Sequence, residues 1–137
     1  MSVAENKQLM HDIFAALSEG NGQPFIDSLA DDFTWTLTGS TAWSKTYVGK
    51  AAVLNDLFRP LFAQFADRYT NVADRIIAED DIVVVECHGQ VTTKAGHPYN
   101  NRYCWVCHIR DGKLQSLTEY MDTQLVATVL ADPERIR

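Results

Sequence analysis

Four runs in the second half of the chain alternate apolar and polar residues, near positions 68–79, 81–93, 100–110 and 113–122. Alternation with a period of two is typical of β-strands that have one buried face. Asp111-Gly112 separates the last two runs, and this dipeptide strongly favours a two-residue hairpin turn. Because short turn segments join all four runs, we expect neighbouring strands to pair in one antiparallel sheet.

The first half of the chain shows helical spacing instead. Ser2-Val3-Ala4-Glu5 has the S-x-x-E pattern of a capping box, which favours a helix start at this point. We expect this helix to end at Gly20 and a short second helix to begin at Pro24. A strand over 33–38 and a loop from residue 39 to about 49 should follow. We then expect a helix from Lys50 with a break or kink at Pro60, and a terminal helix over 124–130. This order predicts an α+β fold, with helices on one side of an antiparallel sheet. No linker or repeat interrupts it, so we expect a single domain over residues 1–137.

Composition and charge exclude several classes of function. Hydrophobic residues make up 46% of the 137 residues and charged residues 22%, which is typical of a globular protein. The net charge of −6 disfavours nucleic acid or an anionic membrane as a partner. The longest aliphatic run, residues 82–85, is too short to cross a membrane, and the polar N-terminus lacks the apolar stretch of a secretory signal. We therefore expect a cytoplasmic protein.

The cysteines and histidines form no recognisable redox or metal motif. Cys104 and Cys107 have C-x-x-C spacing, but they lie in a strand-like run, where side chains three positions apart point to opposite faces. Three cysteines is an odd number, so we expect buried thiols rather than a disulfide framework. Glu86 and His88 share a strand face, but two ligands do not make a metal site. We expect no metal and no cofactor.

Three stretches carry a resemblance to a known family: LADDFTWTLTG, TYVGKAAVL and IRDGKLQSLTEYMDT. With the order of elements, they make the chain resemble the SnoaL-like polyketide cyclases and ketosteroid isomerase-like proteins of the nuclear transport factor 2-like superfamily. The resemblance implies a strongly bent sheet wrapped around three helices, which together form a cone with an apolar pocket. It also implies small hydrophobic ligands and frequent dimers.

The sequence departs from the true ketosteroid isomerases at both catalytic positions. Their general-base carboxylate lies in the stretch that corresponds to residues 36–39 here, which is Thr-Leu-Thr-Gly and contains no acid. The protonated Asp of their oxyanion hole belongs near residues 103–105, where this chain again has no acid. Because that reaction needs a base and donors aimed at the enolate oxygen, we do not expect steroid isomerase activity.

The faces of the sheet decide which residues line the pocket. If Asp111-Gly112 is a two-residue turn, Arg110 pairs with Lys113, and counting outward gives the register. On the last two strands, one face then carries Arg102, Cys104, Val106, Leu117, Glu119 and Met121. We call Glu86, His88, Arg102 and Glu119 the ionisable row. The opposite side, which includes Val85, Tyr103 and Trp105, is called the aromatic face.

Two interpretations of these faces are open. Pattern alone makes the ionisable row solvent-exposed and the aromatic face the core. The resemblance implies the reverse, because family positions matching Leu117, Glu119 and Met121 line the cone and the convex face often packs against a second subunit. We prefer the second interpretation. It predicts that the ionisable row looks into the cavity and that the aromatic face, as the convex sheet face, forms the interface of a homodimer.

Glu119 is the first candidate for acid–base chemistry. A carboxylate on an inward strand face, among Val106, Leu117 and Met121, would be desolvated, and its pKa would rise toward neutrality. Arg102 on the adjacent strand would lower that pKa if the two side chains paired, and Glu119 would then belong to a structural ion pair. Both outcomes are compatible with the sequence.

Each of the other candidates has a structural alternative. His88 could transfer protons near pH 7, or it could simply hydrogen-bond to Glu86. Asp122 resembles a frequent family position, but it could equally cap the terminal helix. The candidate substrate-binding residues, several of which could be ordinary core, are Trp35, Tyr47, Glu86, Val106, Leu117 and Met121. The candidate catalytic residues are Glu119, His88, Arg102 and Asp122.

Two classes of function follow. In the first, the pocket moves a proton on a small hydrophobic carbonyl compound, in an isomerisation or aldol-type cyclisation. In the second, it only binds an apolar metabolite, or the domain serves as a dimeric association module. A third option resembles the limonene epoxide hydrolases, which use an Asp-Arg-Asp set; Arg102 could supply the Arg, but Cys104 replaces one Asp. A buried carboxylate without a compensating cation would favour the first class.

Overall fold

The computed structural model describes residues 2–133 and contains one sheet of six strands. The strands stand in the order β2-β1-β6-β5-β4-β3 across the sheet. Their bounds are Leu29–Leu37 for β1, Thr46–Val48 for β2, Thr70–Glu79 for β3, Ile82–Gln90 for β4, Arg102–Arg110 for β5 and Lys113–Met121 for β6. The four C-terminal strands pair antiparallel in chain order, as their short connections predicted.

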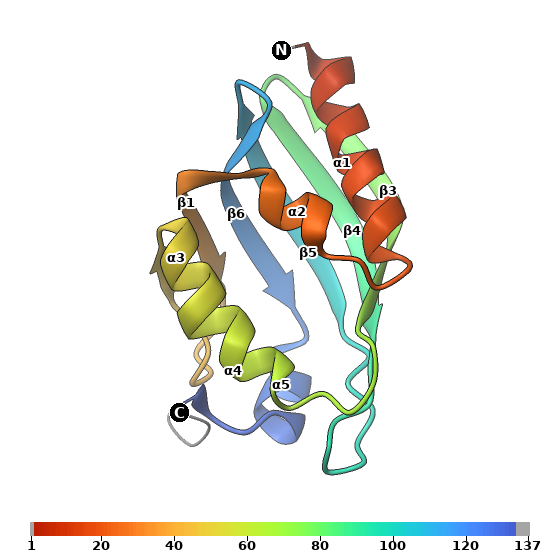
Figure 1. Cartoon of the computed structure of the whole chain (residues 1–137), viewed down its shortest axis with the longest axis vertical. Coiled ribbons are helices and arrows are strands. Elements are labelled where there is room, and N and C mark those ends of the chain that lie inside the picture. The colour runs from red at the N-terminus through yellow and green to blue at the C-terminus, as the bar shows by residue number, and fades with distance from the viewer. Residues whose placement is uncertain (1, 134–137) are drawn as a thin grey trace.

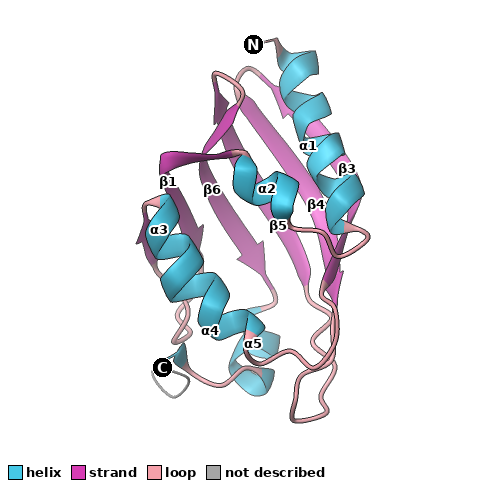
Figure 2. Ribbon diagram, viewed as in Figure 1, coloured by secondary structure: helices cyan, strands magenta, loops and turns pink. Residues whose placement is uncertain are grey.

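Helices cover one face of this sheet, which confirms the α+β fold (Figures 1 and 2). Their bounds are Val3–Leu17 for α1, Gln23–Asp27 for α2, Lys50–Ala52 for α3, Val53–Phe58 for the π-helix η1, Arg59–Phe62 for α4 and Thr123–Val129 for α5. The capping box forms as predicted: the Glu5 backbone N–H donates to the Ser2 hydroxyl, and the Ser2 N–H donates to the Glu5 carboxylate. Among the described residues, no helix is long and apolar enough to cross a membrane.

The N-terminal strands pair differently from the expectation. β1 runs parallel to β6, and the segment expected to be a loop contributes the short strand β2, which pairs antiparallel with β1. Trp35 lies opposite Tyr47 in that pair, and both side chains are buried. Local pattern could not show the pairing of β1 with β6, because it joins segments that are distant in the sequence. The strand β2 spans only three residues, which is too short for an alternating pattern to show.

The helix that begins at Lys50 widens before Pro60 instead of breaking there. The Arg59 backbone N–H donates to the Leu54 carbonyl, five residues back, so the segment 53–58 has π-helical geometry. Pro60 has no N–H to donate, which explains why regular hydrogen bonding fails at this point. The run nevertheless continues to Phe62 and holds Leu57 and Phe58 over the sheet.

The hairpin between β5 and β6 contains a bulge that changes the predicted register. Asp111 and Gly112 both have positive φ, and Arg110 lies opposite Lys113, as the two-residue turn predicted. Ile109 then lies opposite Leu114, but His108 lies opposite Ser116. Gln115 is therefore an extra residue on β6, and every later side chain of β6 lies on the face opposite to the one expected.

The bulge places Glu119 and Leu117 on the face that the helices cover. Glu119 lies opposite Trp105 rather than beside Val106. We call the face covered by the helices the inner face, and the one without helices the outer face. The aromatic face, with Val85, Tyr103 and Trp105, is buried on the inner side, so our prediction that it forms the dimer interface is wrong.

Candidate functional site

A cavity of about 250 Å³ lies between the inner face and the helices. Most of its wall is apolar or aromatic, with Phe25, Phe58 and Leu61 among the contributions from the helical side. A minority of the described lining side chains carry a polar atom. They are Glu119, Asn71, the tyrosines 69, 99 and 103, and the tryptophans 35, 43 and 105. Such a wall binds mainly apolar molecules and uses the few polar groups to orient them.

Of the described residues that line this cavity, Glu119 is the only carboxylic acid, and it is 7% exposed. The Trp105 indole Nε1–H donates to its Oε2 at 2.6 Å. Burial raises the pKa of Glu119 from an ordinary 4.5 to about 7, although the hydrogen bond from Trp105 acts in the opposite direction. Among residues 2–133, no Lys, Arg or His lines the cavity to hold the carboxylate ionised. Near neutral pH, Glu119 can therefore either accept or release a proton.

Three tyrosines provide neutral hydroxyl groups to the same cavity. The Tyr69 hydroxyl donates to the Tyr103 hydroxyl at 3.0 Å, and the buried Asn101 amide donates to the Tyr99 hydroxyl at 3.1 Å. Burial raises the pKa of Tyr69 and Tyr103 well above the usual range and that of Tyr99 to about 12. These groups keep their protons at any physiological pH, so they act as hydrogen-bond donors.

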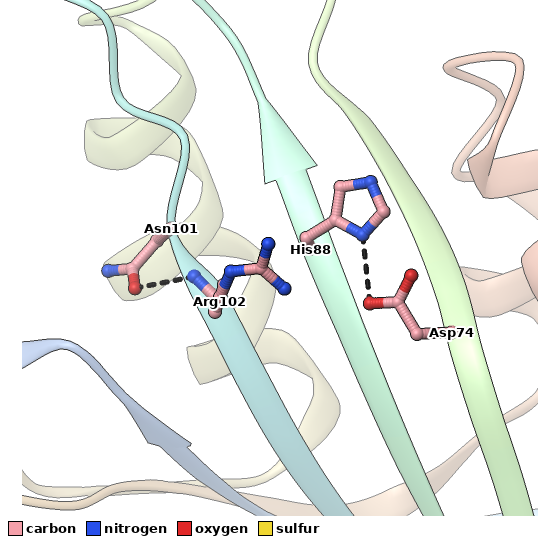
Figure 3. Close-up of polar contacts among 4 residues, drawn as sticks. All are labelled: Asp74, His88, Asn101 and Arg102. Atoms are coloured by element: carbon pink, nitrogen blue, oxygen red, sulfur yellow. Dashed lines mark hydrogen bonds and ion pairs between the residues drawn. The ribbon is translucent and has the colours of Figure 1, made fainter.

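The structure separates the ionisable row, with only Glu119 on the inner face. Glu86 is on the outer face, where it accepts from Arg75 Nε at 2.6 Å. His88 Nδ1 pairs with Asp74 at 2.9 Å on the same face, and Arg102 lies directly opposite His88 in the sheet (Figure 3). Arg102 therefore does not pair with Glu119. The prediction that the whole ionisable row lines the cavity is therefore wrong for Glu86, His88 and Arg102. It assumed a register without the bulge, which would have put these residues on the same face as Glu119.

Val106 also belongs to the outer face, where it pairs with Val84 and is only half-buried. Trp35 and Met121 do line the cavity. Leu117 is fully buried on the inner face without lining the cavity. Tyr47 is buried in the core, where its hydroxyl donates to the Trp43 carbonyl at 3.1 Å.

Asp122 has a structural role in this structure. Its carboxylate accepts from the Leu125 backbone N–H at 3.2 Å and caps α5, which was the alternative left open by the sequence. The Asp122 backbone is held by Asn101, whose side chain donates to its carbonyl and accepts from its N–H. Asp122 does not line the cavity.

The sequence analysis missed the cavity residues Tyr69, Asn71 and Tyr99, and it placed Tyr103 and Trp105 on the wrong side of the sheet. Tyr103 and Trp105 alternate with outward residues on β5, so correct face assignment would have found them. Tyr69 and Tyr99 lie outside regular strands, and their positions depend on tertiary packing.

The cysteines lie as their strand pattern predicted. Cys107 is buried on the inner face, whereas Cys104 is half-buried opposite Glu86 on the outer face. Burial raises the pKa of the Cys87 and Cys107 thiols, so neither is a nucleophile near neutral pH. Within residues 2–133, no three His, Cys, Asp or Glu side chains gather as they would around a metal ion.

Comparison with known proteins agrees with this architecture. An NTF2-like protein from Burkholderia thailandensis superposes with a TM-score of 0.79 at 23% identity, over 96% of this chain and 99% of that one. A candidate SnoaL-like polyketide cyclase from a Jannaschia species gives 0.73 at 13% identity, over 93% and 94% of the two chains. A candidate isomerase from Bacillus subtilis gives 0.74 at 19% identity, over 92% and 93%.

No curated protein matches the chain. The family model described as the SnoaL-like domain, however, matches residues 10–117, from the middle of α1 into β6. These residues include the inner-face side chains Trp35, Tyr103 and Trp105. With a match over most of its length and a nuclear transport factor 2-like fold around an apolar cavity, the chain belongs to the SnoaL-like family.

Proposed function

We propose that this protein uses Glu119 for acid–base catalysis on a small hydrophobic carbonyl compound, without a cofactor. The observation that carries the proposal is a buried carboxyl group whose pKa is about 7, in a cavity whose described lining residues include no cation. A general base or acid works best when its pKa lies near the working pH. The candidate cyclase and isomerase among the similar structures support this class of reaction but not a particular substrate.

The chemistry follows from the groups in the cavity. Glu119 Oε2 accepts from Trp105, and Oε1 has no hydrogen-bond partner within residues 2–133, so Oε1 is free to take a proton. The ionised carboxylate removes a proton from the carbon next to the ligand's carbonyl, and the electron pair of that C–H bond forms the enolate. A tyrosine hydroxyl donates to the enolate oxygen. Tyr103 is best placed for this role, because it lies opposite Met121 and near Trp105 on β5.

Two outcomes of the enolate are consistent with this site. If the ligand also has a C=C bond conjugated with the enolate, Glu119 can return its proton to the γ-carbon of this dienolate. The double bond then shifts, and the reaction is an isomerisation. If the enolate carbon attacks a second carbonyl of the same molecule, a C–C bond forms, the second carbonyl oxygen takes the proton from Glu119, and the reaction is an aldol-type cyclisation. Both regenerate the carboxylate without an oxidant or reductant.

The other functional classes fit the structure less well. Arg102 on the outer face cannot contribute to an Asp-Arg-Asp set in the cavity, which argues against the epoxide hydrolase option. A pocket that only bound apolar metabolites would gain nothing from a desolvated carboxylate, since burying such a group costs stability. Binding without catalysis is the alternative that the following experiment separates.

The experiment measures exchange of carbon-bound protons for deuterium in 2-tetralone by NMR. We expect the wild-type protein to accelerate exchange over buffer, with a rate that rises through pH about 7 and then levels off as Glu119 ionises. Glu119→Gln should reduce the acceleration by about 100-fold or more. The matched control is Glu86→Gln, which removes an outer-face carboxylate and should leave the rate unchanged.

Equal acceleration by the wild-type and Glu119→Gln proteins would end the proposal. Bound 2-tetralone without accelerated exchange at any pH would favour the non-catalytic alternative. Thermal melting of both variants would show that each is folded.

A further inference from the structure

Asn71 is an unpartnered polar residue in the wall of the cavity. Its side chain is 1% exposed, on β3 opposite Gly89. Neither its amide oxygen nor its amide nitrogen has a hydrogen-bond partner among residues 2–133. The side chain lies near enough to the Cys87 thiol to affect its ionisation, but that contact lacks the geometry of a hydrogen bond. Folded proteins rarely leave both the oxygen and the nitrogen of a buried side-chain amide without a hydrogen bond. The Asn71 amide is therefore suited to bind a molecule that enters the cavity.

Trp35 shows the same feature on the same inner face, toward the opposite edge of the sheet. Its indole Nε1 is buried without a partner, whereas the Trp43 indole donates to the Ala131 carbonyl and the Trp105 indole donates to Glu119. The Trp35 ring itself is tightly held, with Phe25, Phe58 and Trp105 at 5.4 to 5.6 Å between ring centroids. The Trp35 ring is thus held in place by its neighbours, while its indole N–H donates to no acceptor among the described residues.

Both residues line the cavity, and this location distinguishes them from a simple packing fault. Four buried side-chain atoms lack a partner among the described residues, and three of them belong to Asn71 and Trp35. The fourth is the Asn6 oxygen on α1, away from the cavity wall. The strand order puts Trp35 on β1 and Asn71 on β3, with the Glu119 strand β6 between them.

We propose that Trp35 and Asn71 recognise two oxygen groups on an uncharged ring compound that lies across Glu119. The indole N–H can only donate, so it selects an acceptor such as a carbonyl oxygen. The amide both donates and accepts, so it selects a hydroxyl group, which does the same. This inference adds a substrate class to the proposed function, but it rests only on the cavity as a binding site and not on catalysis by Glu119.

Size and charge restrict the ligand further. A cavity of about 250 Å³ is below the range of about 300–1,000 Å³ that accommodates drug-sized ligands, so one or two fused rings are the appropriate size. The part of the chain that the structure describes places no cation in the wall to neutralise an anionic ligand, and Glu119 in its ionised form would repel one. A hydroxylated cyclic ketone meets all of these conditions.

The test uses three neutral probes of similar shape: tetralin with no oxygen, 2-tetralone with one, and 6-hydroxy-2-tetralone with one at each end. Calorimetric titration of the wild-type protein should show the tightest binding for 6-hydroxy-2-tetralone. Asn71→Leu should weaken binding of this probe by about ten-fold and leave tetralin unaffected. Trp35→Phe should instead remove the preference for 2-tetralone over tetralin. Asn6→Leu is the matched control, because its orphan oxygen is outside the cavity, and it should bind all three probes like the wild type.

Thermal melting separates a binding role from a structural one. Because Asn71 has no partner in the folded protein, Asn71→Leu should melt at the same or a higher temperature while it loses affinity. A lower melting temperature for Asn71→Leu, unchanged affinities in both variants, or no measurable binding of 6-hydroxy-2-tetralone would overturn the inference. Probe titration and proton exchange of Glu119→Gln keep the two proposals apart. If this variant loses proton exchange but keeps the wild-type probe selectivity, both proposals are supported. If it exchanges protons as fast as the wild type, only the proposed function is refuted.

Discussion

Glu119 combines two features that the sequence suggested separately. Its position on the last strand made it the first acid–base candidate, and burial raises its pKa to about 7. The sequence left open whether Arg102 would neutralise it, because that depended on one register. The structure gives it Trp105 instead, a donor that carries no charge. A neutral donor orients the carboxyl group without fixing it in the ionised state.

The raised pKa of Glu119 makes folding stability depend on pH. Between about pH 4.5 and pH 7 the folded protein keeps a proton that the unfolded chain has released, so the free energy of unfolding falls as pH rises through this range. The shift corresponds to on the order of 3 kcal/mol. Glu119→Gln should lack this loss and be more stable than the wild type at pH 8. Urea unfolding at pH 5 and pH 8 measures both effects, and a wild-type protein of equal stability at the two pH values would contradict the raised pKa.

At the scale of elements, turn chemistry was predictable and the bulge was not. Asp111-Gly112 forms the expected turn, and the first two residue pairs of the hairpin agree with counting. The extra residue Gln115 then reverses the faces of the rest of β6. One signal was available: Leu114 and Leu117 are three apart, so they cannot share a face of a regular strand, and both are fully buried. A bulge between them resolves the conflict.

Gly89 on β4 provides the space that Tyr69 needs. A Cβ atom at this position would lie 2.6 Å from the Tyr69 hydroxyl oxygen and 2.9 Å from its ring. We predict that Gly89→Ala lowers the free energy of unfolding by about 1–3 kcal/mol, since the added methyl displaces the ring. The same displacement should break the 3.0 Å hydrogen bond between Tyr69 and Tyr103 and weaken binding of 2-tetralone.

Gly22→Ala is the control for that substitution. Its added Cβ would have no neighbour within 4 Å, and its φ of −88° suits any residue, so we expect a change below about 0.5 kcal/mol. Urea unfolding of both variants makes the comparison. If Gly89→Ala and Gly22→Ala have equal free energies of unfolding, the packing of Tyr69 does not require a residue without a side chain at position 89.

At the scale of the whole molecule, resemblance predicted more than pattern did. Alternation and turn residues identified the four C-terminal strands, but the parallel pairing of β1 with β6 joins segments about 80 residues apart. No local signal specifies such a contact. Each interpretation of the sheet faces was correct in part. The aromatic face is the core, as pattern indicated, and Glu119 and Met121 line the cavity, as the resemblance implied.

The outer face is where we now place the proposed homodimer contact. Its centre carries Val84 opposite Val106 and Cys104 opposite Tyr120, and Tyr120 is 51% exposed. The ion pairs of Glu86 and His88 lie beside this centre. Covering a half-exposed tyrosine and two valines by a second copy would bury apolar surface that a monomer leaves in water.

We predict that the wild-type protein sediments as a dimer at micromolar concentration and that Val106→Glu sediments as a monomer. A carboxylate in the middle of the contact would be buried against its own copy, which should weaken association by on the order of 100-fold. Gln8→Glu adds the same charge on an exposed part of α1 and should leave the dimer intact. A monomeric wild-type protein at the highest soluble concentration would remove the homodimer from consideration. A dimer that survives Val106→Glu would place the contact elsewhere than the outer face, because no apolar centre on a symmetric interface tolerates two opposed carboxylates without losing affinity.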